Sequence, residues 1–178
     1  MNQSNSIRMQ VLCALFAAVT AILSQLIIPI QPVPITLGTF AALMAGGFLG
    51  KRYGALSIII YLLLGAVGVP VFSMMRAGMS VLAGPSGGFI VGFAPMAFVV
   101  GLVAEKWGYT FKNLLLATIL GTAVCYAMGL AWFMFVTGTG LWASMVMCMF
   151  PFLPGDSAKI LLASFLVSKY HKRLIGGY

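Results

Sequence analysis

Pro154-Gly155-Asp156-Ser157-Ala158-Lys159 sets the interpretation of this chain, because it places a carboxylate and an ammonium group in an otherwise apolar stretch. The chain has only two acidic residues among 178. Residues three apart are neighbours on a helix surface, so Asp156 and Lys159 face the same side of any helix that begins here. A charge inside a membrane segment costs about 2.5–3.5 kcal/mol on insertion scales and usually marks a functional site. This pair is therefore the first candidate for a site.

Composition indicates that the rest of the chain lies in a membrane. Hydrophobic residues make up 62% and charged residues 7%, against about 25% charged residues in soluble domains, and the mean hydropathy is +1.10. A spanning helix needs about 20 apolar residues, so we expect one all-α domain of six transmembrane helices. The expected spans are 7–28, 36–49, 53–69, 87–104, 113–136 and 156–169, with a re-entrant or interfacial segment at 141–152.

Basic residues set the expected orientation, since cytoplasmic loops retain Lys and Arg. With the N-terminus inside, only Arg76 falls in an outer loop, and Lys159 lies in the sixth span. The others fall on the cytoplasmic side: Arg8, Lys51, Arg52, Lys106, Lys112, Lys169, Lys172 and Arg173. We therefore expect a multi-pass protein of the cell membrane with both termini cytoplasmic. The net charge of +8 then needs no nucleic acid partner.

Asp156 has two interpretations. As an N-cap, its carboxylate accepts backbone N–H groups of the sixth span and faces the positive end of the helix dipole, while Lys159 extends to the interface. An N-cap role for Asp156 does not explain why a lysine follows three residues later. A paired carboxylate and ammonium at the mouth of a helix instead suits a small polar ligand that carries both donors and acceptors.

The proline-rich loop 29–36 lies on the same outer side. Its three prolines make it stiff and extended, so Gln31 or Thr36 offers hydrogen bonds at little ordering cost. A rigid connection between two helices explains the prolines equally well.

The longest outer loop, 68–88, combines glycines, apolar side chains and Arg76. This mixture is typical of a lid that lies over a pocket. Its last part contains Ser86 and Gly87, and a simple turn that caps the following helix explains that part equally well.

Small residues form a stripe along the first span. Ala14, Ala17, Ala18 and Ala21 recur at three- and four-residue spacings, which lets another helix approach closely. The neighbour is either a helix of this chain or a partner subunit, and the stripe alone does not decide between them.

Several motifs together resemble one family. They are Pro34-Ile-Thr36, Gly65-Ala-Val-Gly-Val-Pro-Val-Phe72, Gly84-Pro-Ser-Gly-Gly-Phe89, Pro154-Gly-Asp-x-x-Lys159 and the alanine-striped first span. Their order, over nearly the whole chain, is similar to BioY, the biotin-specific S component of energy-coupling factor (ECF) transporters. The resemblance implies six helices that bind biotin from outside. It also implies docking onto a transmembrane T component that two cytoplasmic ATPases drive.

The resemblance also assigns roles to residues. It implies that loop 68–88 is a lid and that Ala14, Ala18 and Ala21 contact the partner. Biotin offers ureido N–H donors, oxygen acceptors and an apolar bicyclic ring, so Asp156 would accept from the ureido group and Lys159 would meet an oxygen. The candidate substrate-binding set is Asp156, Lys159, Arg76, Phe72, Thr36, Ser86, Gly87 and Tyr126, with Trp132 as a further ring-packing candidate. The stretch 73–76 departs from the glycine-richer sequence of the family.

The sequence gives little indication of enzymatic activity. The stretch 45–52 is the nearest to a Walker A loop and fails at its first and last positions, Ala45 and Arg52. His171 lies in a basic tail, where we expect it to be solvated. We expect no cofactor and no metal, because the cysteines lack metal-ligand spacing and suit buried apolar positions; they are Cys13, Cys125 and Cys148.

Glu105, beside Lys106, is expected to form an exposed ion pair of little energetic weight. An S component for another vitamin would keep the architecture and change the pocket. An ion-coupled small-molecule carrier would use Asp156 as a titrating group.

Overall fold

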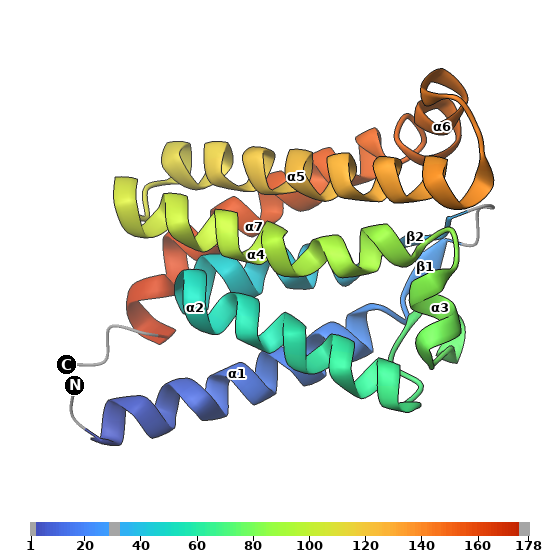
Figure 1. The fold of residues 1–178 in the computed structure, drawn as a ribbon. Helices are drawn as coiled ribbons and strands as arrows, with labels where there is room; N and C mark the ends of the chain where they lie inside the picture. The colour runs from blue at the N-terminus through green and yellow to red at the C-terminus, as the bar shows by residue number, and fades with distance from the viewer. Residues whose placement is uncertain (1–2, 29–32, 175–178) are drawn as a thin grey trace.

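The computed structural model describes residues 3–28 and 33–174, which form a helical bundle with one short β-hairpin (Figure 1). The hairpin pairs β1 (Ile27–Ile28) with β2 (Ile35–Thr36) in antiparallel register, Ile27 opposite Thr36. The helices are α1 (Gln3–Leu23), α2 (Gly38–Val67), α3 (Met79–Ala83), α4 (Gly87–Trp107), α5 (Phe111–Thr137), α6 (Leu141–Cys148) and α7 (Leu153–Leu174).

Length and hydropathy make several of these helices able to cross a membrane. Of the helices in the described ranges, α1, α2, α4 and α5 are long and apolar enough, and α6 with α7 adds a fifth if that pair, bent by 61°, counts as one span. A helix satisfies its own backbone hydrogen bonds, which hydrocarbon cannot do. The expected segment 141–152 contains α6 and the bend that leads into α7.

The helix α2 reverses direction at Gly50, where φ is 76° and ψ is −178°. In a straight helix, residues nine apart are about 13 Å from each other, yet a Cβ on Gly54 would lie 2.8 Å from the carbonyl oxygen of Ala45. Figure 1 shows the two halves, 38–49 and 51–67, running back along each other. The sequence predicts separate spans at 36–49 and 53–69, and the break at Gly50 lies between them.

Glu105 holds this reversal. Its Oε1 accepts a hydrogen bond from the backbone N–H of Lys51 at 2.9 Å, and its Oε2 lies 3.2 Å from Lys51 Nζ. The carboxylate thus binds the free N-terminal end of the second half of α2. Glu105 thus forms the expected exposed ion pair, but its partner is Lys51, which folding brings to the end of α4, and not the neighbouring Lys106.

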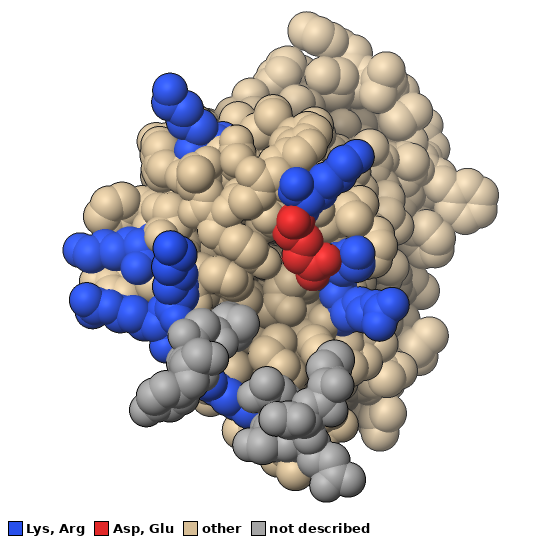
Figure 2. Space-filling model, turned by 90° about the vertical axis from the view of Figure 1, so that its left-hand side faces the viewer, with Lys and Arg blue, Asp and Glu red and all other residues tan. Residues whose placement is uncertain are grey.

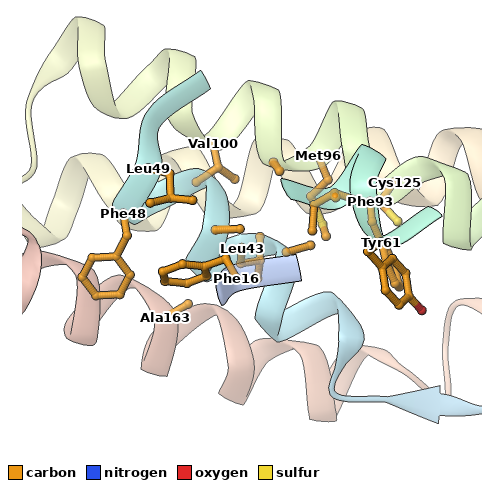
Figure 3. Packing of buried hydrophobic residues seen from close by; sticks show 14 of the residues in the cluster. Phe16, Leu43, Phe48, Leu49, Tyr61, Phe93, Met96, Val100, Cys125 and Ala163 are labelled. Atoms are coloured by element: carbon orange, nitrogen blue, oxygen red, sulfur yellow. The ribbon is translucent and has the colours of Figure 1, made fainter. Parts of the chain in front are cut away.

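The hydrophobic core lies where α1, α2 and α4 meet. Figure 3 shows Phe16, Leu43, Met96 and Val100 pointing into this common interior. Phe16 of α1 and Phe48 of α2 pack with ring centroids 6.0 Å apart. Close approach of α2 to α4 depends on a glycine, since a Cβ on Gly46 would overlap the backbone of Ala97.

Charged side chains segregate to the two ends of the bundle. The start of α1 and the end of α7 lie together, and Arg8 Nη2 donates to Leu174 O at 2.7 Å. Figure 2 looks onto this end and shows Lys and Arg side chains gathered there. The β-hairpin, α3 and α6 lie at the opposite end (Figure 1).

Candidate ligand-binding site

Asp156 and Lys159 form an ion pair near the start of α7. Lys159 Nζ lies 2.7 Å from Asp156 Oδ1, and the two residues are only 6% and 8% exposed. They occupy positions i and i+3, so the helix itself holds the two groups side by side. The sequence-based expectation that they share one helix face is confirmed.

Three further groups complete the network around the pair. The hydroxyl of Tyr126, on α5, donates to Asp156 Oδ2. Lys159 Nζ also donates to Thr36 O at 2.8 Å and to Thr39 Oγ1 at 3.0 Å. An ammonium has three N–H donors, so all three are used, whereas the carboxylate retains free lone pairs. A ligand donor can therefore add directly to Asp156, while a ligand acceptor must replace one partner of Lys159.

The capping interpretation of Asp156 is wrong. The helix α7 begins at Leu153, three residues before the expected start of the span. The backbone N–H of Asp156 donates to Phe152 O at 2.8 Å, so this residue already lies within the helix. Pro154 fits the first turn because an N–H there would have no partner within the helix. The carboxylate is consequently directed to Tyr126 and Lys159.

The ion pair lines a cavity of about 50 Å³ at the hairpin end of the bundle. Organic ligands usually occupy sites of about 300–1,000 Å³, so the walls must part to admit one. The walls combine aromatic and aliphatic side chains with a few hydroxyls, which suits a ligand with an apolar body and polar edges. The lining residues are Ser24, Val33, Pro34, Ile35, Thr36, Thr39, Tyr61, Ser73, Ser86, Phe89, Ile90, Phe93, Met96, Thr122, Cys125, Tyr126, Phe152, Asp156 and Lys159.

Comparison with known proteins gives the family. The model of the BioY family matches residues 1–176. The chain belongs to the BioY family. It is 40% identical to the biotin transporter BioY of Rhizobium etli over 90% of this chain and 91% of that one. It is also 40% identical to the biotin transporter BioY of Thermotoga maritima, over 68% of this chain and 72% of that one. A crystal structure described as the S-component for biotin from an ECF-type ABC transporter superposes with a TM-score of 0.90 at 29% identity, covering 97% of this chain and 95% of the other.

In this member of the BioY family, three further predicted residues lie beside the ion pair. Thr36, Ser86 and Tyr126 line the same cavity as Asp156 and Lys159. They come from β2, from the turn before α4 and from α5. Folding thus gathers polar groups from four separate segments at one end of the bundle.

Phe72 and Gly87 lie behind the wall of the cavity. Phe72 is fully buried and packs edge-on against Tyr61, with ring centroids 5.6 Å apart. A Cβ on Gly87 would overlap the carbonyl of Leu82, so this glycine permits the tight approach of α3 to the start of α4. Direct contact of either residue with a ligand stays a prediction.

Arg76 and Trp132 also lie outside the lining. Arg76 is exposed, and its Nε donates to Ser73 O at 3.3 Å. Trp132 Nε1 donates to Gly84 O at 3.0 Å, which fastens the turn before α4 onto α5. Gln31 lies outside the described residues.

Sequence reasoning missed several wall residues whose spacing carried a usable signal. Thr122 stands four residues before Tyr126 on α5, and Phe89 stands four residues before Phe93 on α4. Residues i and i+4 share a helix face, so each pair lines the cavity together. Ser24 had no such signal, because its place in the wall depends on the hydroxyl of Tyr61, which donates to it at 3.1 Å.

The alanine stripe on α1 divides between two faces. Ala17 is buried in the core, whereas Ala14 and Ala18 are exposed and Ala21 is half-buried. The stripe therefore serves internal packing at Ala17 and Ala21 and leaves an outward surface of small side chains at Ala14 and Ala18.

Other reactive residues take structural positions. The three cysteines are buried and free, as expected. Within residues 3–28 and 33–174, no cluster of three or more His, Cys, Asp or Glu is placed to hold a metal ion. His171 is half-buried and stacks on Tyr109 with ring centroids 3.5 Å apart, so the expectation that it is solvated is wrong.

Proposed function

We propose that this chain captures biotin as the substrate-specific S component of an ECF-type transporter. The observation that carries the proposal is the buried Asp156–Lys159 pair, joined to Tyr126 and facing a cavity with aromatic walls. Membership of the BioY family and the likeness to the biotin S-component structure support the same ligand.

The hydrogen-bonding capacities of the pair match the chemistry of biotin. Asp156 keeps lone pairs free and accepts the ureido N–H groups without losing its own partners. Lys159 meets a ligand oxygen by giving up its bond to Thr39 or to the Thr36 carbonyl. Phe89 and Phe93 supply apolar faces for the bicyclic ring. Charge-assisted hydrogen bonds of this kind are about twice as strong as neutral ones, so they dominate recognition.

The same proposal gives the chain six crossings of the cell membrane. The two halves of α2 count as separate spans, and α7 forms the last one. The end that carries most of the Lys and Arg side chains (Figure 2) faces the cytoplasm, with both chain termini. The cavity then opens toward the outside, where the ligand is scavenged.

Partners supply the energy in this proposal. The stretch 45–52 lacks two positions of a Walker A loop, so a T component and two cytoplasmic ATPases would drive uptake. The exposed Ala14 and Ala18 on α1 offer the close-approach surface for the transmembrane partner. Biotin is the transported ligand, and no cofactor takes part.

Calorimetric titration of the detergent-purified chain with biotin tests the proposal, with riboflavin and thiamine as controls. We expect tight binding of biotin alone. Binding of another vitamin would keep the S-component architecture and replace the ligand. Absence of binding by all three would overturn the assignment and favour an ion-coupled carrier.

A further inference from the structure

Gln25 joins the end of α1 to a turn that forms part of the cavity wall. Its Nε2 donates to Val71 O and Phe72 O, both at 3.0 Å, and its Oε1 accepts from the backbone N–H of Met75 at 3.0 Å. A third acceptor, Ala21 O on α1, lies 3.3 Å from Nε2. The amide thus pairs its donors with carbonyls and its oxygen with an N–H, which fixes its orientation.

The turn that Gln25 binds, residues 71–76, contains strained backbone. Met74 and Met75 have φ of 62° and 55°, in the left-handed region that disfavours side chains. Both methionine side chains are exposed, at 58% and 64%, so burial of these side chains does not offset the strain. Within the turn, the N–H of Phe72 donates to Arg76 O at 3.1 Å. Gln25 thus binds the backbone before the strained pair, at Val71 and Phe72, and within the pair, at Met75.

This turn adjoins the proposed biotin site. Ser73 lines the cavity, and Phe72 packs against Tyr61, which also lines it. Ser24, the chain neighbour of Gln25, is in the wall as well and accepts from the hydroxyl of Tyr61. Gln25 therefore holds together the side of the cavity formed by Ser24 just after α1, Tyr61 of α2 and the turn.

The turn 71–76 is the part of the cavity wall that is suited to open. The cavity of about 50 Å³ is too small for a bicyclic ligand, so some wall must move before biotin enters. The walls contributed by α4, α5 and α7 are parts of long packed helices. The turn 71–76 is short and strained; Val71 and Phe72 pack in the core, and the hydrogen bonds of the half-buried Gln25 join the backbone of the turn to the end of α1.

We propose that Gln25 is a positioning residue that clamps the turn 71–76 against the cavity and thereby sets the rate at which bound biotin escapes. The inference rests on the proposed function. Release of the clamp lets the strained part of the turn relax outward, and Ser73 of the cavity wall moves with it. Gln25 itself stays out of the cavity lining and acts through the turn.

Dissociation kinetics of labelled biotin from the purified full chain test this role. Gln25→Leu removes the hydrogen bonds at similar side-chain size, and we expect biotin to dissociate at least about tenfold faster than from wild type. Gln10→Leu is the matched control, because Gln10 is exposed on α1, the helix that precedes Gln25, and its dissociation rate should equal that of wild type. An unchanged rate in Gln25→Leu would overturn the inference.

A rescue experiment separates clamping from a general loss of stability. Glycine tolerates the left-handed region, so Met74→Gly with Met75→Gly should restore much of the slow dissociation to Gln25→Leu. A general packing defect would gain nothing from these changes, and failure of the rescue would contradict the clamp.

Amide hydrogen exchange on wild type covers the case in which Gln25→Leu does not fold. We expect the N–H of Met75 to be protected and biotin to slow its exchange further; exchange that is fast and insensitive to biotin would overturn the inference. If wild type does not bind biotin, the proposed function fails instead. The two failures are thus distinguishable.

Discussion

At the residue scale, the site depends on one buried ion pair, and the two members of the pair form their other hydrogen bonds with different segments. Asp156 is bound by Tyr126 from α5, and Lys159 by Thr36 from β2 and Thr39 from the start of α2. Removing one partner of a buried pair leaves an uncompensated charge, which costs about 3–5 kcal/mol. The hydrogen bonds of the pair therefore depend on how α5, β2 and α2 are placed around α7.

We expect Asp156→Asn and Lys159→Met each to weaken biotin binding by about a hundredfold or more, because each leaves a ligand group and a buried partner unmatched. Calorimetric titration measures the loss. Lys51→Met is the matched control, since it breaks the ion pair to Glu105 at the opposite end of the bundle. Wild-type affinity in both site variants would contradict the assignment.

At the element scale, the reversal within α2 shows how a single backbone position sets the architecture. Gly50 adopts a left-handed φ, and Glu105 of α4 binds the backbone immediately after it. The apolar residues on either side predict helices, and Gly50 separates them. Only the fold brings Glu105 to this point, which is why its role was missed in the sequence.

We expect Gly50→Ala to lower thermal stability markedly, because a Cβ there meets Glu105 Oε1 and the backbone is strained as well. Gly108→Ala is the matched control: its φ is 89° but no atom lies within 4 Å of the added Cβ. A thermal-shift assay in detergent compares the two. An equal loss in both variants would mean that backbone strain alone, without the Glu105 contact, explains the effect.

At the scale of the whole molecule, basic side chains mark one end of the bundle and the cavity with the Asp156–Lys159 pair marks the other. Basic side chains gather where α1 begins and α7 ends (Figure 2), and the cavity lies beside the hairpin at the other end. The exposed Ala14 and Ala18 run along α1 between these ends. The proposed orientation and the proposed partner docking therefore both depend on how the whole bundle is arranged.

We expect Ala18→Trp to abolish biotin uptake in cells that contain the partner subunits while sparing biotin binding by the purified chain, since a bulky side chain prevents close helix approach. Ala127→Trp on α5 is the matched control, because Ala127 is likewise exposed on a long helix. Loss of uptake in both variants, or in neither, would remove the special role of α1.

Cysteine labelling in intact cells checks the orientation. In a background without the native cysteines, we expect Arg76→Cys to react with a membrane-impermeant maleimide from outside and Lys51→Cys to react only after the cells are opened. The reverse pattern would place the basic end outside.

The sequence by itself determined the membrane character, the expected helical segments and the pairing of Asp156 with Lys159, because composition and i,i+3 spacing are local properties. It also carried the motifs that pointed to the BioY family. The tertiary structure alone decided that Tyr126, Thr36 and Thr39 satisfy the pair, that Phe72 and Arg76 lie outside the cavity lining, and that Gln25 holds the turn 71–76. These contacts join residues 30 to 123 positions apart in the chain. Their partners are fixed by how the helices pack, which no local pattern records.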